Sequence, residues 1–283
     1  MSIYIPPNCN TLESVFEQQI RLGIQGFPDT GKTWSSLTFP NPIVINLNRG
    51  LKAHQGRKDV YEVPFYKMYN RKQYKEAYIA WLDKEGSKLT SEQTLITDSL
   101  SDLHTAYHIW YRDNEAMIAV SPKTGKINEY AEFNFKTQYF EEIGNIFLSL
   151  KCHIVLICHE IERADKPTSI GQPGNYTGKI RPLITGQTGD TIIKDYSDWF
   201  RAHVAAKPTD YSKISPESLA NWGMKSTEEF KAMSESFVDS SAIFYWQTHG
   251  DDLFNAKAGS LINAPKFIPA NYQSLTKYMR KII

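Results

Sequence analysis

Residues 26–33 read Gly26-Phe27-Pro28-Asp29-Thr30-Gly31-Lys32-Thr33. This stretch matches the phosphate-binding loop pattern G-x-x-x-x-G-K-[ST] at every fixed position. Residues 20–24 are a short apolar alternation typical of a buried strand, and residues 33–39 can form a helix that ends at Pro40. A strand, a tight loop and a helix N-terminus together surround a phosphate with backbone N–H groups and the positive end of a helix dipole. The stretch therefore predicts a site for a nucleoside triphosphate.

Two side chains of this loop have predicted roles of their own. Lys32 is expected to reach the β- and γ-phosphates, and the hydroxyl of Thr33 is expected to ligate Mg²⁺. The other predicted nucleotide-binding residues run along the loop to the first helical residues: Gly26, Phe27, Pro28, Asp29, Thr30, Gly31 and Trp34. The alternative is a Gly-rich turn that matches by accident, but the flanking strand and helix favour the phosphate site.

A magnesium-bound triphosphate needs a carboxylate across the site, at the C-terminal end of a neighbouring strand. Asp98 fits this requirement because it ends the strand-like run 94–98. Asp102 lies one turn further on and is a weaker candidate. The alternative for Asp98 is a turn residue that caps the next helix. We prefer the Mg²⁺ role because the lysine loop already demands such an acid.

His159 and Glu160 follow another apolar run, residues 153–158. A residue that senses the γ-phosphate stands at such a strand end in this architecture, so His159 is predicted to hydrogen-bond the γ-phosphate or its attacking water. Glu160 is predicted to polarise that water. The alternative is a polar strand end that faces solvent.

Composition limits the class of protein. The chain has 283 residues, of which 41% are hydrophobic and 22% are charged, and its net charge is +1. These values are ordinary for a soluble globular protein and give no global attraction to nucleic acid or acidic lipid. Three cysteines show no metal-ligand spacing, and no apolar run approaches the ~20 residues of a membrane span. The sequence predicts a soluble, cytoplasmic protein with no membrane contact.

Strands alternate with helices along the chain. The predicted strands are residues 42–48, 60–65, 94–98, 153–158, 200–206 and 242–248, and the predicted helices include 71–84 and 272–282. The alternation predicts an α/β fold, a mostly parallel sheet with helices on both faces. We expect an N-terminal arm at 1–19 and one domain at 20–283, with a long loop at 161–190 and a helical insertion at 207–240.

The order of these segments resembles a known family. The segments are the loop at 26–33, a strand at 43–47, a strand with its acid at 95–98, a strand with histidine at 154–159, and the late stretch Phe254-Asn255-Ala256-Lys257. Over residues 20–260 this order resembles the RecA-like ATPases carried by phages, a group of AAA-domain proteins of which some act as single-strand annealing recombinases. The resemblance implies a RecA-like core, ATP with Mg²⁺, single-stranded DNA as partner, and a homo-oligomer such as a filament or ring.

The resemblance also gives Lys257 a role and leaves one gap. Members of the family present a lysine here to the ATP of a neighbouring subunit, where it would act as an arginine finger does. A solvated surface lysine is the alternative. Relatives often carry an acid-x-Glu pair after the strand that follows the loop, but this chain has Asn46-Leu47-Asn48. An amide cannot accept the water's proton as a carboxylate does, so ATP binding is a firmer prediction than hydrolysis.

The loop at 161–190 is the predicted DNA contact, because single-strand binding combines cations with aromatic rings. The predicted DNA-binding residues are Arg163, Lys166, Tyr176, Lys179 and Arg181. A flexible lid over the nucleotide is the alternative for this loop. Two other functions stay open for the chain as a whole. One is a P-loop kinase for a small molecule, which the absence of clustered lid arginines disfavours, and the other is a nonhydrolytic ATP switch or loader.

Overall fold

The computed structural model describes residues 19–114, 120, 125, 129–164, 176–184, 196–237, 240–252, 254 and 256–279. At residues 129–130, 162–164, 176–179 and 181 it describes the backbone only. The predicted arm at 1–19 therefore falls almost wholly outside the described residues.

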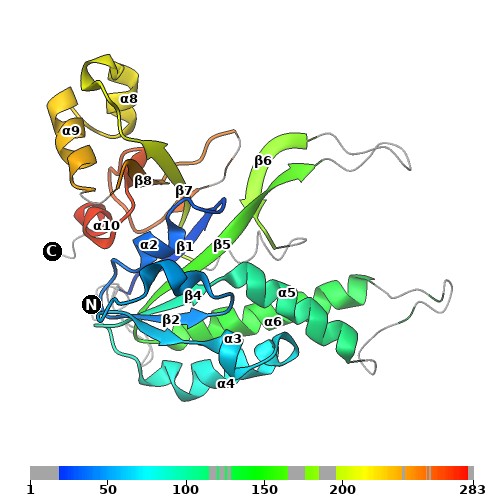
Figure 1. The fold of residues 1–283 in the computed structure, drawn as a ribbon. Helices are drawn as coiled ribbons and strands as arrows, with labels where there is room; N and C mark the ends of the chain where they lie inside the picture. Colours follow the sequence, from blue (N-terminus) through cyan, green and yellow to red (C-terminus); the bar gives the residue numbers. More distant parts are fainter. Residues whose placement is uncertain are drawn as a thin grey trace, which may run out of the picture.

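The described strands form one ten-stranded sheet in the order β10-β8-β7-β1-β5-β4-β2-β3, with β6 paired to β5 and β9 paired to β7 (Figure 1). Strands β1 to β5 and the pair β1–β7 run parallel, while β6, β8, β9 and β10 join antiparallel. The strands are β1 (Arg21–Gly26), β2 (Pro42–Asn46), β3 (Tyr61–Val63), β4 (Thr94–Asp98), β5 (His153–Ala164), β6 (Tyr176–Pro182), β7 (Asp198–Ala206), β8 (Ala242–Gln247), β9 (Lys257–Ala258) and β10 (Phe267–Pro269). The predicted fold class, α/β with a mostly parallel sheet, is confirmed.

Helices cover both faces of this sheet (Figure 1). Helices α4, α5 and α6 pack on one face, and the short helices α2 and α10 pack on the other. The helices are α2 (Lys32–Ser36), α3 (Phe65–Met68), α4 (Tyr74–Lys84), α5 (Leu100–Asp113), α6 (Glu129–Ser149), α8 (Pro216–Asn221), α9 (Thr227–Glu235) and α10 (Tyr272–Tyr278). The described residues also include the 3₁₀ turns η1 (Gly50–His54), η2 (Arg71–Gln73), η3 (Gly86–Lys88) and η5 (Tyr211–Lys213). None of the described helices is long and apolar enough to cross a membrane.

Two apolar cores fix the sheet between its helices. The first is rich in aromatic rings, with Tyr107 stacked on Tyr139 at a centroid distance of 5.3 Å. The second joins β1 and β5 to α10 and to the segment that follows α2, through residues such as Ile24 and Val155. Burial of apolar surface on both faces explains why Ile154 to Cys158, in the middle of β5, is a continuous apolar run. The parallel pairing of β5 with β1 and β4 places the C-terminal ends of the three strands at one edge of the sheet.

The segment 161–190 differs from the predicted loop. Strand β5 continues to Ala164, and β6 returns antiparallel beside it, with a register shift between Glu162 and Ala164. The Gly and Pro content of this segment hid the pairing, which needs only backbone groups and tolerates a bulge. The predicted loop is therefore wrong where β5 and β6 form a two-stranded ribbon.

Residues 207–237 leave the sheet after β7. Ser215 and Ser226 cap the N-termini of α8 and α9, because their hydroxyl groups accept hydrogen bonds from backbone N–H groups of the first turn. A third apolar cluster, which includes Phe230 and Phe237, holds them together. The rings of this cluster reach the phosphate loop, because Trp34 packs on Phe237 and Phe244 at centroid distances of 5.9 and 5.5 Å.

Candidate nucleotide-binding site

Two glycines permit the turn between β1 and α2. A Cβ atom at Gly26 would lie 2.6 Å from Oγ1 of Thr30, and one at Gly31 would lie 2.4 Å from the Phe244 ring. Gly31 also has φ of +76°, in the left-handed region that favours glycine. The loop therefore needs glycine at both positions, one for close approach and one also for its backbone angle.

Lys32 turns its ammonium group back over this loop. Its Nζ donates to the carbonyl oxygens of Gly26 at 2.9 Å and Phe27 at 2.6 Å. Burial lowers the pKa of Lys32, while the charges of Asp98 and Glu160 oppose that shift. The ammonium group donates to neutral carbonyl oxygens, and the carboxylates are more distant. A charged phosphate oxygen in place of a carbonyl oxygen would accept a stronger hydrogen bond. Lys32 is thus positioned to bind a phosphate that enters the loop.

Thr33 and Asp98 meet across the site. Thr33 Oγ1 donates to Asp98 Oδ2 at 2.8 Å, although 65 residues separate them in the chain. Asp98 is 4% exposed, and burial raises its pKa to about 6, with the Thr33 hydrogen bond and Lys32 acting against the shift and Asp102 adding to it. A hydroxyl and a carboxylate are the hard oxygen ligands that Mg²⁺ takes in proteins. These two residues therefore fit a magnesium ion beside a bound polyphosphate.

Asn48 stands where relatives of the resembled family carry a glutamate. Its Nδ2 donates to Asp102 Oδ2 at 2.8 Å, and its Oδ1 accepts from the backbone N–H of Gly50 at 2.8 Å. The same turn passes close to the magnesium site, since a Cβ at Gly50 would lie 3.3 Å from Asp98 Oδ2. Both ends of the Asn48 amide are engaged, so this position supplies no base.

His159 lies directly beside the loop. Its backbone pairs with Gly26 at the end of β1, and its N–H donates to Oγ of Ser101 at 3.0 Å. Burial lowers the pKa of His159 and the Lys32 charge lowers it further, while Asp102 opposes them. A neutral imidazole at physiological pH can accept a hydrogen bond from water or a protonated phosphate.

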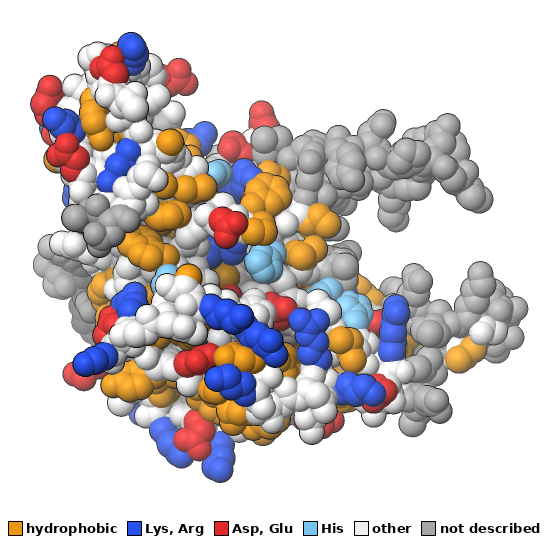
Figure 2. Space-filling view, viewed as in Figure 1, with side chains coloured by type: hydrophobic (Ala, Val, Ile, Leu, Met, Phe, Trp, Pro, Cys, Tyr) orange, Lys and Arg blue, Asp and Glu red, His pale blue; other side chains and the backbone are white. Residues whose placement is uncertain are grey.

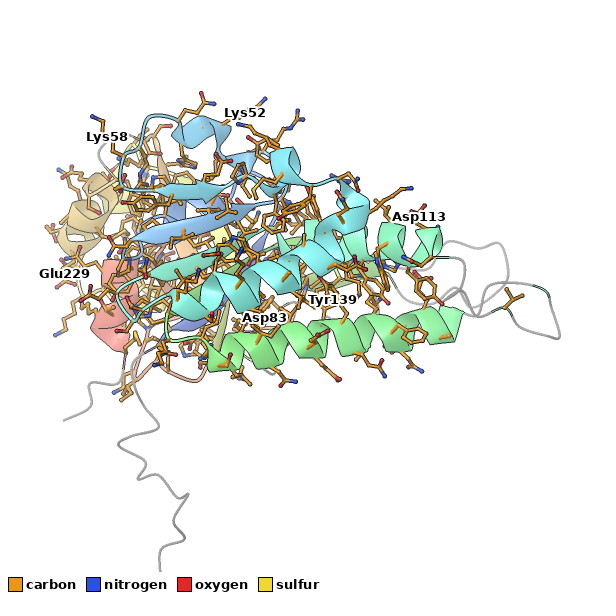
Figure 3. All side chains as sticks on the ribbon, turned by 90° about the horizontal axis from the view of Figure 1, so that it is seen from below. Lys52, Lys58, Asp83, Asp113, Tyr139 and Glu229 are labelled. Atoms are coloured by element: carbon orange, nitrogen blue, oxygen red, sulfur yellow. The ribbon has the colours of Figure 1, made fainter. Side chains whose placement is uncertain are left out.

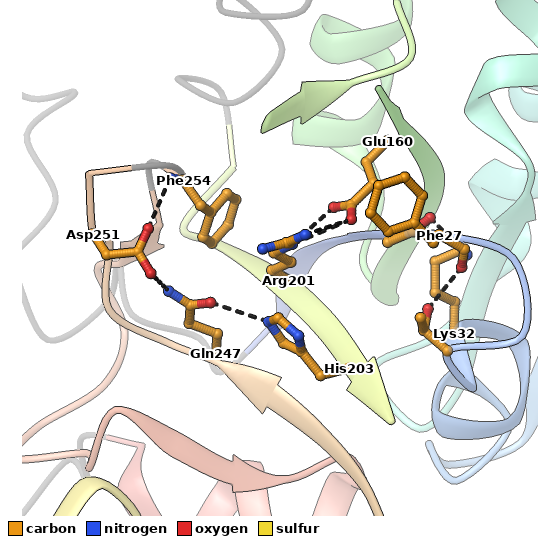
Figure 4. Close-up of polar contacts among 10 residues, drawn as sticks. Phe27, Lys32, Glu160, Arg201, His203, Gln247, Asp251 and Phe254 are labelled. Carbon is orange, nitrogen blue, oxygen red and sulfur yellow. Dashed lines mark hydrogen bonds and ion pairs between the residues drawn. The ribbon is translucent and has the colours of Figure 1, made fainter. Parts of the chain in front are cut away.

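Glu160 is bound by an arginine that the sequence did not single out. Arg201 Nε and Nη2 donate to the carboxylate at 2.8 to 3.2 Å, with side chains 13% and 1% exposed (Figure 4). The guanidinium also lies 5.9 Å from the centroid of the Phe27 ring. Strands β5 and β7 flank β1 in the sheet, so this ion pair bridges the point where β1 gives way to the loop. The only signal in the sequence was an arginine inside the apolar strand 200–206.

Glu160 therefore meets a different partner from the one predicted. Both of its carboxylate oxygens accept from Arg201, which reduces their capacity to polarise a water. A polar chain continues from β7 outward: His203 Nε2 lies 3.0 Å from Gln247 Oε1, and Gln247 Nε2 donates to Asp251 at 2.8 Å (Figure 4). Asp251 in turn accepts from the backbone N–H of Phe254 at 2.9 Å.

Of the remaining predicted residues, Trp34 directly follows the loop in α2, and the others lie in another strand or outside the described part. Lys257 is in β9, where its backbone pairs with Trp199 of β7, and Trp199 pairs with Gly23. This register places Lys257 level with a residue well before the loop. Among the predicted DNA contacts, Lys166 and the side chains of Arg163, Tyr176, Lys179 and Arg181 lie outside the described residues. The Trp34 side chain packs against Phe237 and Phe244.

Residues 18–207 match a family model described as an AAA domain. The chain belongs to this AAA domain family. The AAA domain spans β1 to β7 and thus includes Lys32, Thr33, Asp98, Glu160 and Arg201. Its phosphate loop and strand-end aspartate make it a P-loop NTPase domain, for which nucleotide binding is the family property.

Comparison of structures gave distant matches to this AAA domain protein. The RadB recombinase is 13% identical, with 66% of this chain and 76% of that chain covered and a TM-score of 0.33. The flagellar accessory protein FlaH from Methanocaldococcus jannaschii is 12% identical, with 68% and 76% covered and a TM-score of 0.34. A search of curated proteins gave no match.

The ion pair at the loop makes a prediction about stability. The Arg201 guanidinium is nearly buried, and Glu160→Gln removes its counter-charge. We therefore expect a loss of about 3 kcal/mol in the free energy of unfolding. Arg201→Gln should cost a similar amount, but the double variant should cost far less than the sum, because each single change already breaks the pair. Urea unfolding of the four proteins measures this. Additive losses would show that the two side chains do not depend on each other.

Proposed function

We propose that the chain binds Mg-ATP and acts on single-stranded DNA, as a RecA-like protein of phage recombination, annealing or repair in the host cytoplasm. The observation that carries the nucleotide part is the hydrogen bond from Thr33 to Asp98 beside the Lys32 ammonium. These three groups come from a loop and a strand that is not its neighbour in the sheet, and they converge on one point. A carboxylate, a hydroxyl and an ammonium group gathered at one buried point do not contribute to apolar packing, so they fit a site for a polar ligand.

Different residues of the site would bind the phosphates and the magnesium ion. The backbone N–H groups of 29–33 and the Lys32 ammonium bind the β- and γ-phosphates, and Lys32 gives up its carbonyl partners as it does so. Thr33 and Asp98 hold the magnesium ion, which neutralises charge on the phosphate oxygens when bound. His159, neutral and adjacent to Gly26, accepts a hydrogen bond near the γ-phosphate.

A nonhydrolytic switch is the second candidate, and two observations favour it. Asn48 offers an amide where a base would stand, and Glu160 is held by Arg201. Water activation by Glu160 would require Arg201 to leave the carboxylate, for example toward an incoming phosphate. Without that exchange the protein would bind ATP and change its surface while turning over slowly.

Support for the DNA partner and for assembly comes from the resemblance to single-strand annealing recombinases. In that reading a homo-oligomer, a filament or ring, would bring Lys257 of one subunit to the ATP of the next. The position of Lys257 in β9, away from the loop of its own chain, is compatible with such a role.

One experiment separates these functions. ATP binding is measured by a fluorescent analogue, and phosphate release is measured with and without single-stranded DNA. Release that DNA stimulates supports the recombinase reading, and binding without release supports the switch. Turnover that depends on a small-molecule acceptor would instead identify a kinase, and no nucleotide binding would refute the site.

A further inference from the structure

A second pocket opens beside the magnesium site, at the C-terminal end of β2. We call it the β2-edge pocket, and its polar lining is Asn48, Arg49, Tyr66, Tyr69, Asn70 and Arg71. Its volume is about 330 Å³, and its walls come from the turn after β2, helix α3 and the start of η2. Nothing in the nucleotide site described above uses its arginines or its half-buried rings.

Arg49 is held in this pocket by an unusual backbone. Its φ is +70°, in the region where glycine or asparagine is less strained, and Asn46 Oδ1 accepts from its N–H at 2.9 Å. The guanidinium lies 5.4 Å from the centroid of the Tyr66 ring, and Lys67 Nζ lies 5.5 Å from the same ring. A strained arginine over an accessible aromatic ring is typical of a binding site more than of a structural turn.

The cations continue beyond the pocket. Lys52 in η1 and Lys67 in α3 are exposed, and neither forms an ion pair with any residue of the described chain, nor does Arg49. Lys and Arg side chains gather on this face around β2 and α3 (Figure 2). Lys52 projects away from the body of the molecule at this edge (Figure 3). A small anion would need only the cations of the pocket itself. Cations that continue beyond the pocket fit a ligand with several phosphates in a row.

We infer that the β2-edge pocket and its flanking Lys52 and Lys67 bind a single-stranded nucleic acid. The cations contact phosphates, and the rings of Tyr66 and Tyr69 offer faces on which bases stack. This inference rests on the proposed function and gives it a second surface, in addition to the predicted contacts at 161–190.

The pocket is connected to the magnesium site through one carboxylate. Arg71 Nη2 lies 3.7 Å from Asp102 Oδ1, and Asn48 donates to the other oxygen of Asp102 at 2.8 Å. Asp102 is thus the residue that the pocket and the turn after β2 share.

The test measures binding of a fluorescein-labelled thymidine oligonucleotide by anisotropy at several salt concentrations. Arg49→Gln with Arg71→Gln should weaken binding on the order of tenfold and reduce the slope of log K against log salt by about 1.4, since two phosphate contacts are lost. Tyr66→Leu should weaken binding by about fivefold or more with little change in slope. Lys213→Gln with Lys231→Gln, two exposed lysines of the α8–α9 region, is the control of equal charge loss and should change neither.

Each outcome has one meaning. An unchanged affinity and slope in the arginine pair, or an equal loss in the lysine control, overturns the β2-edge pocket as the binding surface. Thermal unfolding confirms that each variant is folded. Mg-ATP binding by the unaltered protein is measured in the same preparation, so that failure of the nucleotide site is recognised separately from failure of this surface.

Discussion

Lys32→Ala is expected to raise the Kd for Mg-ATP by about 100-fold or more while the protein stays folded. Lys32 is the buried cation of the loop, and in the nucleotide complex its two carbonyl partners are replaced by phosphate oxygens. A hydrogen bond to a charged group contributes about 1.5–3 kcal/mol, so the loss of one or two of them accounts for the expected change. Phe27 is exposed, so its carbonyl oxygen can bond to water in the variant, whereas the carbonyl oxygen of the buried Gly26 loses its partner.

Titration of a fluorescent ATP analogue gives the two dissociation constants, and thermal unfolding tests the fold. Lys58→Ala is the matched control, because Lys58 is exposed and projects outward at the edge of the molecule, outside residues 26–33 (Figure 3). Its affinity should equal that of the unaltered protein. Nucleotide affinity that survives Lys32→Ala would mean that residues 26–33 do not form the triphosphate site.

The sequence predicted the parts of the site in which phosphate binding requires particular residues close together in the chain. Residues 26–33 need glycine for close approach and lysine for charge, so their pattern carries the prediction by itself. Asp98 was predicted because a magnesium-bound triphosphate in that loop needs a carboxylate at the end of a nearby strand. In the structure Asp98 Oδ2 lies 2.8 Å from Thr33 Oγ1. The fold class followed from a different pattern, since strands that alternate with helices along the chain predict a mostly parallel sheet.

Arg201 could not be found in this way, because its role depends on which strands flank β1. Glu160 and Arg201 are 41 residues apart, and they meet only because β5 and β7 lie on either side of β1. The antiparallel ribbon of β5 and β6 escaped prediction for a similar reason. Backbone pairing over a bulge leaves little trace in side-chain periodicity, and Gly and Pro suggested a loop.

The β2-edge pocket illustrates the same limit. Arg49, Tyr66 and Arg71 come from three separate elements, and no spacing in the sequence links them. The amides of Asn46 and Asn48 were interpreted as a missing base. In the structure they shape the turn that holds Arg49 and connect it to Asp102. A residue that cannot act as a base can thus have a structural role, which becomes visible only in the folded chain.

Asp98→Asn is expected to have opposite effects on nucleotide binding and on stability. Mg²⁺ should no longer strengthen ATP binding, because the amide has no charge for the ion. The variant without ligand should be more stable than the unaltered protein at pH 7 to 8, by about 1–3 kcal/mol, because the buried carboxylate no longer has to ionise. The asparagine Oδ1 can still accept the hydrogen bond from Thr33.

The pH dependence follows from the direction of the shift. Burial raises the pKa of Asp98 from 3.8 to about 6, so between these values the folded state binds more protons than the unfolded state. Stability of the unaltered protein therefore falls, relative to Asp98→Asn, as pH rises from about 4 to about 6, and the difference is constant above that range. Mg²⁺-dependent ATP binding should weaken as pH falls through about 6. Urea unfolding and ATP titration across this range measure both, with Asp83→Asn, an exposed carboxylate, as control. Equal stability of the two proteins at all pH values would contradict the raised pKa of Asp98, and magnesium dependence that survives in Asp98→Asn would place the magnesium site elsewhere.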